Sequence, residues 1–453
     1  MLVVQLLLPR FLVVEVVFFI HFVQGQACLT KSNKSSKEEN SSNNNVLSSD
    51  DDQEAACLVP MNNSTLIEQE PLFQDFHGKI IQPTLVDKKS AIVIPRFSPI
   101  FVSCPSARLP YFDEKAASTT NVIELECAGA TGNTLQIKDS QKILPSFKDL
   151  SCSRSIRESV KETDVSCGPS DEKNSDAKIV DIGWKTVKGF IPQISVCHDR
   201  QREHTFYSTH AIIGSSLDAR NTDPKRPYFK EGGRRFYSKS SAAKIYQKSS
   251  QESNLLTKYN IFDNYLARGH LAPDADFIYK EMQDATYYYF NVAPQWQNFN
   301  NGNWKFVESL VRRHATKRKQ NLRVHTGTFE NLQLDGDTIA LGKNSNLIPV
   351  PLYFWKLVFD ENFTHAIAFV AINHPKIREI EDGDSIPLRY DLCPSESATL
   401  CEDQSWKIRS RKSAKKGLLY CCSYQSLKKR IPWIPENHAN VGLLSYDVND
   451  SFK

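Results

Sequence analysis

The sequence lacks a dominant charge, a zinc-binding cysteine pair and an internal repeat. Its 56 basic and 52 acidic side chains leave a formal net charge of only +4, and many secreted proteins with no nucleic-acid partner carry as much. No two of its eleven cysteines have the CxxC spacing, which argues against a zinc ribbon. With 40% hydrophobic and 24% charged side chains over 453 residues, the composition is that of a folded globular protein. Local features must therefore indicate the function.

A long apolar segment is also missing, except at the start of the chain. Residues 1–27 combine an apolar run with small residues at Gly25 and Ala27, either of which can precede a signal-peptidase cut. Arg10 and Glu15 interrupt the run, which leaves it shorter than the ~20 apolar residues of a membrane span. We therefore expect a signal peptide at 1–27, a secreted, extracellular protein and no stable membrane association.

The cysteines fit an oxidising compartment, in which thiols pair and persist as disulfides. We expect disulfides, but the sequence leaves their connectivity open, and the odd total leaves one thiol free or paired between chains. The sequence also permits N-glycosylation, which fits an exported protein. Asn-x-Ser/Thr sequons occur at Asn33, Asn40, Asn62, Asn63, Asn362 and Asn449.

Composition divides the rest of the chain into three parts. A polar, low-complexity run of Lys, Ser, Asn and Asp cannot bury enough apolar surface to order itself, so we expect a disordered leader over 28–75. Short apolar stretches separated by Pro, Gly and Asn turns then predict a small β-rich domain over 76–175. Over 176–453, strand-like segments are segregated from one helical segment at 309–320, which predicts an α+β domain. Its strands are expected over 179–199, 204–214, 322–329, 348–359 and 365–373.

One segment, 266–308, gathers the residue types that phosphoryl chemistry needs. Arg268, Gly269 and His270 place a permanent cation beside a titratable imidazole. Asn300, Trp304 and Glu308 are spaced by four residues. A helix would place these three side chains on one face, with the amide and the carboxylate two turns apart.

Phosphodiester hydrolysis requires a deprotonated water, positive charge near the developing phosphorane and stabilisation of the leaving oxygen. An imidazole is a competent base near neutral pH, since its ordinary pKa is about 6.5. A hard divalent cation bound through an Asn oxygen keeps most of its waters and binds phosphate, and Arg268 can contact the phosphate directly. The segment therefore indicates a metal-dependent endonuclease.

These residues resemble the DNA/RNA non-specific endonuclease family, whose members have a ββα-metal fold and a motif written DRGH; secreted insect double-stranded ribonucleases are similar. The resemblance implies that His270 is the general base, that Asn300 is the only protein ligand of Mg²⁺, which Mn²⁺ can replace, and that Glu308 supports the water shell of the metal. The family's second Asn, which precedes a Pro-Gln pair, matches Asn291, which the resemblance places among the catalytic residues with Arg268. The likeness extends more loosely over 179–426. It implies a central, mostly antiparallel sheet flanked by helices.

Two positions depart from the family pattern. The first Asp of DRGH is Ala267 here; in the family that Asp is neither the base nor the metal ligand, so its loss leaves the core mechanism intact. An upstream Arg that the family places near the scissile phosphate has no clear match, and Arg202 is the nearest candidate. Two basic stretches are further candidates for phosphate contacts, although either one alone can equally be a solvated face. Their candidate residues are Arg234, Arg235, Arg312 and Arg313.

Several alternatives stay open at this point. The aromatic run 287–290 and Trp304 are expected in the core rather than as base-stacking platforms. A secreted protein of the same fold can capture nucleic acid through phosphate contacts without cleaving it. The preference between DNA and RNA, or between single and double strands, cannot be read from the sequence because phosphate contacts carry no such information. The oligomeric state is unknown.

Overall fold

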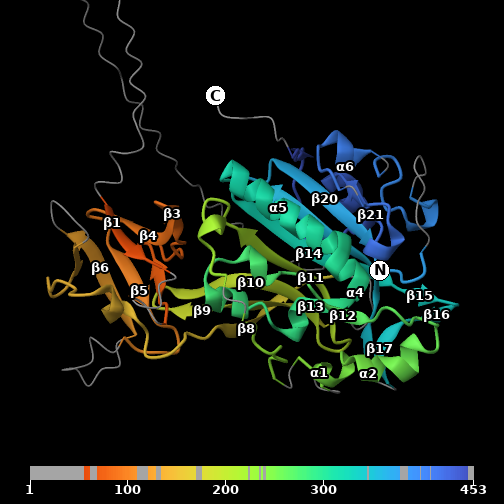
Figure 1. Ribbon diagram of the computed structural model, residues 1–453, viewed down its shortest axis with the longest axis horizontal. Coiled ribbons are helices and arrows are strands. Elements are labelled where there is room, and N and C mark those ends of the chain that lie inside the picture. The colour runs from red at the N-terminus through yellow and green to blue at the C-terminus, as the bar shows by residue number, and fades with distance from the viewer. Residues whose placement is uncertain are drawn as a thin grey trace, which may run out of the picture. The chain divides into compact units, whose positions relative to one another are not determined.

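A computed structural model of the chain (Figure 1) describes most residues between 56 and 446. The predicted signal peptide and the low-complexity run lie outside the described residues. The described ranges are 56–61, 69–109, 121–128, 134–169, 176–222, 225–233, 236–237, 241–343, 346–377, 386–397, 399–408 and 410–446.

Two small antiparallel sheets form from the first part of the described chain. Their strand orders are β1-β4-β3 and β2-β5-β6-β7, and buried side chains alternate with partly exposed ones along β1 and β6, as expected for strands with one face in a core. Two of these strands, β1 and β2, fall inside the range predicted as a disordered leader. The difference has a covalent cause, because Cys57 on β1 is bonded to Cys127 on β6. The strands are β1 (Ala56–Pro60), β2 (Leu72–Gln74), β3 (Thr84–Val86), β4 (Lys89–Pro95), β5 (Ile100–Ser103), β6 (Val122–Ala128) and β7 (Thr134–Ile137).

A nine-stranded sheet forms the centre of the remaining chain. Its order is β21-β20-β19-β14-β11-β10-β9-β8, with β22 beside β20. All of its strand pairs are antiparallel except β20 with β22, which confirms the predicted α+β class. The domain boundary at 175/176 stays a prediction. The central sheet extends across it, since β8 lies before the boundary and pairs with β9 after it. The strands are β8 (Ser159–Ser166), β9 (Ala177–Thr186), β10 (Gly189–Asp199), β11 (His204–Ile212), β14 (Leu322–Asn331), β19 (Pro351–Asp360), β20 (His365–Ile372), β21 (Leu419–Cys422) and β22 (Gly442–Leu443).

Shorter elements complete the fold. Three two-stranded sheets are formed by β12 (Leu266–His270) with β13 (Val292–Trp296), β15 (Gln333–Leu334) with β16 (Asp337–Thr338), and β17 (Ala340–Lys343) with β18 (Asn346–Pro349). The α-helices are α1 (Ala242–Ile245), α2 (Lys248–Gln251), α3 (Lys280–Asp284), α4 (Gln297–Phe299), α5 (Lys305–Arg318), α6 (Leu400–Asp403) and α7 (Tyr424–Arg430). Among the residues with described positions, no helix is both long and apolar enough to cross a membrane.

The longest helix, α5, confirms the helix predicted at 309–320 and begins earlier, at Lys305. Its buried residues recur at i, i+3, i+4, i+7 and i+8, the spacing of one apolar helix face. This face shares a hydrophobic core with residues of β14 and β19, and Figure 1 shows α5 lying across the sheet. The buried residues of α5 are Val307, Leu310, Val311, His314 and Ala315.

Five disulfides connect ten of the eleven cysteines, which confirms the expectation of disulfides; Cys28 lies outside the described residues. Two adjacent cysteines on β21 have different partners. Because neighbouring side chains point to opposite faces of a strand, these two bonds anchor β21 from both sides. The pairs are Cys57–Cys127, Cys104–Cys152, Cys167–Cys197, Cys393–Cys422 and Cys401–Cys421.

Candidate active site

The Arg-Gly-His sequence lies on β12, which pairs residue by residue with the antiparallel β13. Because side chains alternate along a strand, Arg268 and His270 point to the same side. Gly269 lies between them and faces Gln295, where a Cβ added to Gly269 would lie 2.4 Å from the side-chain Oε1 atom. The glycine is therefore explained by this close approach.

Three aromatic rings surround the guanidinium of Arg268. Its central carbon lies 5.3 Å from the ring centroid of Phe229, 5.7 Å from that of Tyr246 and 5.6 Å from that of Tyr289. Such contacts attract a cation electrostatically and are each worth about 0.5–2 kcal/mol. The rings thus hold the only charged group of β12 at one place.

His270 lies beside the same aromatic cluster. Its ring centroid is 5.2 Å from that of Phe229 and 5.1 Å from that of Tyr287. The Nε2 atom of His270 is buried and has no hydrogen-bond partner within the described part of the chain. A buried polar atom without a protein partner is unusual and suits a group that meets a water or a substrate.

The surroundings of His270 keep its imidazole neutral. Burial lowers the pKa of His270 to about 4, and the positive charges of Arg226 and Arg268 contribute to the decrease. The carboxylate of Asp274 acts in the opposite direction. The imidazole is therefore in its unprotonated, basic form throughout the neutral pH range.

Asn291 fixes the loop that follows His270. Its buried side chain donates from Nδ2 to the carbonyl oxygens of Ala272 and Thr286, both at 2.9 Å, and accepts at Oδ1 from the backbone nitrogen of Ala272 at 3.1 Å. Backbone groups thus occupy this amide. Asn291 therefore positions the loop that follows β12.

Between β13 and α5 the chain passes through α4 and a wide π-helical turn, η7 (Asn300–Trp304). The backbone of Gly302 is not helical, and a Cβ at this position would lie 2.5 Å from the carbonyl oxygen of Lys416. The continuous helix that would align Asn300, Trp304 and Glu308 on one face is therefore interrupted. Trp304 is fully buried, as expected for a core residue, whereas Asn300 and Glu308 are half-buried.

A buried ion cluster consists of His210, Asp276 and Arg312, of which Arg312 belongs to α5. Asp276 accepts a hydrogen bond of 2.9 Å from Nε2 of His210 and one of 2.7 Å from Nη1 of Arg312. Burial raises the pKa of Asp276, but the bond from His210 and the charge of Arg312 outweigh this effect and hold the pKa well below its usual range. The carboxylate is therefore ionised and Arg312 is fixed in place.

Glu308 contrasts with this cluster. Its carboxylate has no hydrogen bond or ion pair with any residue whose position is described, and burial raises its pKa to about 7. Lys356 and Arg312 oppose this rise through their charges. Lys356 is itself fully buried, and its Nζ atom donates to Thr326 at 2.6 Å.

Asp274 connects the strand-borne and the helix-borne residues of the site. Its charge affects the pKa of both His270 and Glu308, so both side chains lie within electrostatic range of one carboxylate. Asp274 also accepts a hydrogen bond of 2.7 Å from the hydroxyl of Tyr287. We use "candidate site" for Arg268, His270, Asp274 and Glu308 together with Asn300, which precedes α5 and whose place in the site stays a prediction from the family resemblance.

Comparison with known proteins agrees with this arrangement. The model of a protein family described as DNA/RNA non-specific endonuclease matches residues 176–426, more than half of the chain. The chain belongs to this family. The resemblance expected from the residues between Arg268 and Glu308 is thereby confirmed, and the strand-strand-helix order of β12, β13 and α5 agrees with the ββα fold that it implies.

Individual relatives of this endonuclease family member carry related descriptions. A salivary endonuclease of Lutzomyia longipalpis is 31% identical over 288 residues, which are 62% of this chain and 66% of the relative. Salivary protein Tsal2A of Glossina morsitans morsitans is 25% identical over 72% of this chain and 80% of its own length. The mitochondrial nuclease of Saccharomyces cerevisiae is 26% identical over 47% of this chain and 68% of its own length.

The predicted phosphate-binding arginines occupy different places in this endonuclease family member. Arg312 belongs to the buried ion cluster, and Arg313 is exposed beside the ring of Phe306. Arg202 lines a separate cavity whose lining includes no residue of the candidate site. Arg234 and Arg235 lie outside the described residues.

Several residues that the sequence analysis did not single out belong to the candidate site or act on its members. Asp274 and Asp276 follow His270 within six positions, and two carboxylates so close to the motif could have indicated that they belong near the site. Lys356 was also detectable, because it is the only basic residue in a strand that is apolar along most of its length. Phe229 gave no signal, since it reads as part of a basic stretch.

The donor set suits a hard divalent cation with few protein ligands. The side chain of Asn300 has no hydrogen-bond partner among residues of described position, and Glu308 is a carboxylate whose burial is not offset by a direct partner. Among all the residues that the structure describes, no group of three or more His, Cys, Asp or Glu side chains is arranged to hold a metal. An amide oxygen with bound waters is a coordination that Mg²⁺ accepts.

Proposed function

We propose that the chain is a secreted endonuclease that hydrolyses phosphodiester bonds of DNA, RNA or both, duplex RNA included, with little sequence specificity. The observation that carries the proposal is that Arg268 and His270 point to one side of β12, with the imidazole neutral and its Nε2 atom unpartnered among the described residues. Family membership supports the reaction class.

His270 acts as the general base. Its neutral ring accepts a proton from the attacking water, and the lowered pKa ensures that it is free to do so at neutral pH. Arg268, held by its three rings, contacts a phosphate oxygen and offsets the charge of the transition state. Asn291 positions the loop after His270 through its backbone hydrogen bonds.

Asn300 would hold the divalent cation, Mg²⁺ or Mn²⁺, through its side-chain oxygen, with Glu308 accepting hydrogen bonds from waters around it. When bound, such an ion stabilises negative charge on the phosphate and on the leaving oxygen. Arg312 adds positive charge beside Glu308. Arg313, Arg202, Arg234 and Arg235 are candidates for contacts with more distant phosphates, which would strengthen binding without sequence preference.

Export is part of the same proposal. Residues 1–27 have the pattern of a signal peptide, and the five disulfides are of the kind that persists in an oxidising compartment. Two of the relatives are described as salivary proteins. These observations favour a secreted enzyme over a mitochondrial one.

The decisive experiment compares plasmid DNA, single-stranded RNA and duplex RNA as substrates for the purified protein, with Mg²⁺, with Mn²⁺ and with EDTA. We expect cleavage with either ion and none with EDTA. Asn300→Ala should require a much higher cation concentration for half-maximal activity, whereas the neighbouring, exposed Asn301→Ala should not. Undiminished cutting in EDTA would refute the role of the cation. Tight binding without cleavage by the wild-type protein would establish a binding protein instead.

A further inference from the structure

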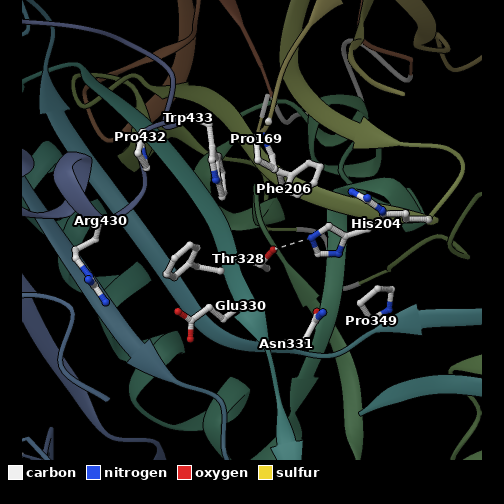
Figure 2. A pocket seen from close by; sticks show the side chains of 13 residues that line it. Pro169, His204, Phe206, Thr328, Glu330, Asn331, Pro349, Arg430, Pro432 and Trp433 are labelled. Carbon is white, nitrogen blue, oxygen red and sulfur yellow. Dashed lines mark hydrogen bonds between the residues drawn. The ribbon is translucent and has the colours of Figure 1, made fainter. Parts of the chain in front are cut away.

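The cavity that Arg202 lines has a volume of about 940 Å³ and lies at the ends of β11 and β14. Figure 2 shows Trp433 and Phe206 on one side of it, Glu330 and Asn331 on the other, and Arg430 and His204 at its two ends. Ligand pockets in proteins usually have volumes between about 300 and 1,000 Å³. The cavity is therefore large enough for a nucleotide.

This cavity and the candidate site lie on opposite faces of the nine-stranded sheet. Trp355 and Lys356 are neighbours on β19, so their side chains point to opposite faces. Lys356 lies 5.6 Å from the ring of Trp304 and acts on the pKa of Glu308. Trp355 instead lies 6.3 Å from the ring of Trp433. A ligand in the cavity would thus be remote from His270.

Trp433 is a fixed aromatic surface at the wall of the cavity. Its ring lies 5.4 Å from that of Phe206 and is stacked on Tyr207 at 6.3 Å with an angle of 16° between the planes. Trp433 is only half-buried although these rings support it. A rigid, partly exposed indole is suited to stacking with a planar group such as a nucleobase.

Positive charge accompanies this aromatic surface. Arg430 is exposed at the C-terminal end of α7, and Arg202 belongs to the same lining, where Asp199 lies 3.6 Å from it. Glu330 and Asn331 add hydrogen-bonding groups opposite the rings. An aromatic ring combined with arginines is the combination with which proteins bind single-stranded nucleic acid.

We propose that this cavity binds one unpaired nucleotide of a single-stranded nucleic acid, with its base stacked on Trp433 and its phosphate paired with Arg430. The proposal rests on the proposed function, because it assumes a nucleic-acid substrate. A base within a duplex is not available for stacking, so the contact favours single strands or frayed ends over continuous duplex. Its remote position means that it increases affinity for long substrates and takes no part in the chemistry.

The test measures binding of the full-length protein, in EDTA at one fixed low salt concentration, to a labelled single strand of about 20 nucleotides, longer than the usual site size of a single-strand-binding fold. We expect Arg430→Ala and Trp433→Ala to raise the Kd about tenfold and Trp433→Phe to raise it less. Lys429→Ala is the matched control, because it removes an exposed positive charge from the preceding position of α7, outside the cavity lining. Its Kd should equal that of the wild type.

Two further arms identify the ligand. A duplex of the same length should lose less affinity than the single strand in Arg430→Ala, and an excess of AMP should displace part of the single strand from the wild-type protein. A single strand containing 5-bromouracil, irradiated on the protein, should attach to the peptide that carries Trp433. This arm needs no variant, so it remains informative if Trp433→Ala does not fold.

The failures of the two proposals are distinguishable. A wild-type protein that neither binds nucleic acid nor cuts it with Mg²⁺ overturns the proposed function together with this one. A wild-type protein that cuts, while Arg430→Ala and Trp433→Phe bind single strands normally and all crosslinks fall near His270, overturns the second site alone.

Discussion

In the buried ion cluster, Asp276 accepts hydrogen bonds from both His210 and Arg312, whereas His270 and Glu308 have no hydrogen-bond partners among the residues of described position. Each region contains an imidazole and a carboxylate, which are buried in the cluster and half-buried in the candidate site. Satisfied groups contribute to the stability of the fold, while unsatisfied ones reduce it and suit a substrate or a cation. The difference separates residues that support the site from residues that act in it.

The largest expected effect tests the unpartnered side of this comparison. His270→Ala removes the proposed base, which contributes about 10²–10⁴-fold in comparable enzymes, so cleavage should fall by at least 100-fold on the same scale. Its melting temperature should fall only modestly, because the variant loses ring packing on Phe229 and Tyr287 but no hydrogen bond to a residue of described position. His365→Ala, at an exposed position of β20, is the control. Wild-type cleavage by His270→Ala would require another base.

The next effect is on stability and concerns the partnered side. Asp276→Asn leaves Arg312 without its counter-charge, and breaking a buried pair in this way usually costs about 3–5 kcal/mol. We expect a clearly lower unfolding midpoint in urea under non-reducing conditions. Glu308→Gln should leave the midpoint unchanged or raise it, since a neutral amide avoids the cost of burying a charge, while activity falls about 10–100-fold. Equal destabilisation by both variants would contradict the distinction between residues that support the site and residues that act in it.

The pH dependence of cleavage gives a smaller effect. Because burial lowers the pKa of His270 to about 4, the base stays deprotonated well below its ordinary pKa of about 6.5. In the Glu308→Gln variant, which removes the carboxyl group whose pKa burial raises to about 7, the residual kcat/KM at saturating cation should therefore hold as the pH falls to about 5 and decline towards pH 4. A decline centred near pH 6.5 would show a solvated imidazole. The folded state should lose stability as the pH falls from about 6.5 to about 4, because the unfolded imidazole binds a proton in this range and the folded one does not.

The smallest effect belongs to the exposed arginine of α5. Arg313→Ala should weaken binding evenly across sequences and reduce the slope of log affinity against log salt by about 1, as expected for the loss of one phosphate contact. Arg312→Ala should also lower stability, since it removes a partner of Asp276. If both variants changed only the salt slope, Arg312 would not belong to the supporting cluster.

Much of the fold and the central motif could be predicted from the sequence, because those signals are local. Strand-like runs and the one strong helical segment lie where β14, β19, β20 and α5 form, and RGH is a contiguous motif. The spacing of Asn300 and Glu308 was also readable, but the break at Gly302 was not. That break is explained by the close approach of Lys416, more than a hundred positions away in the chain.

The supporting residues depend on contacts that no local pattern encodes. His210 meets Asp276 across 66 positions of the sequence, and Phe229 reaches Arg268 from a segment that reads only as basic. Arg202 was considered for the scissile phosphate as the nearest arginine to the strands of the site, and a contact with substrate stays a prediction. The structure places it in the lining of the cavity that contains Trp433.

Cys421 and Cys422 on β21 have a consequence for production of the protein. Their side chains point to opposite faces of the strand, and each is bonded to a different partner. Exchanging the two partners would require the strand to shift by one residue, which turns every side chain to the wrong face. The two disulfides of β21 therefore form correctly only when the strand pairs in its correct register. Material made in a reducing host and oxidised later is expected to contain molecules in which this edge of the sheet has not formed.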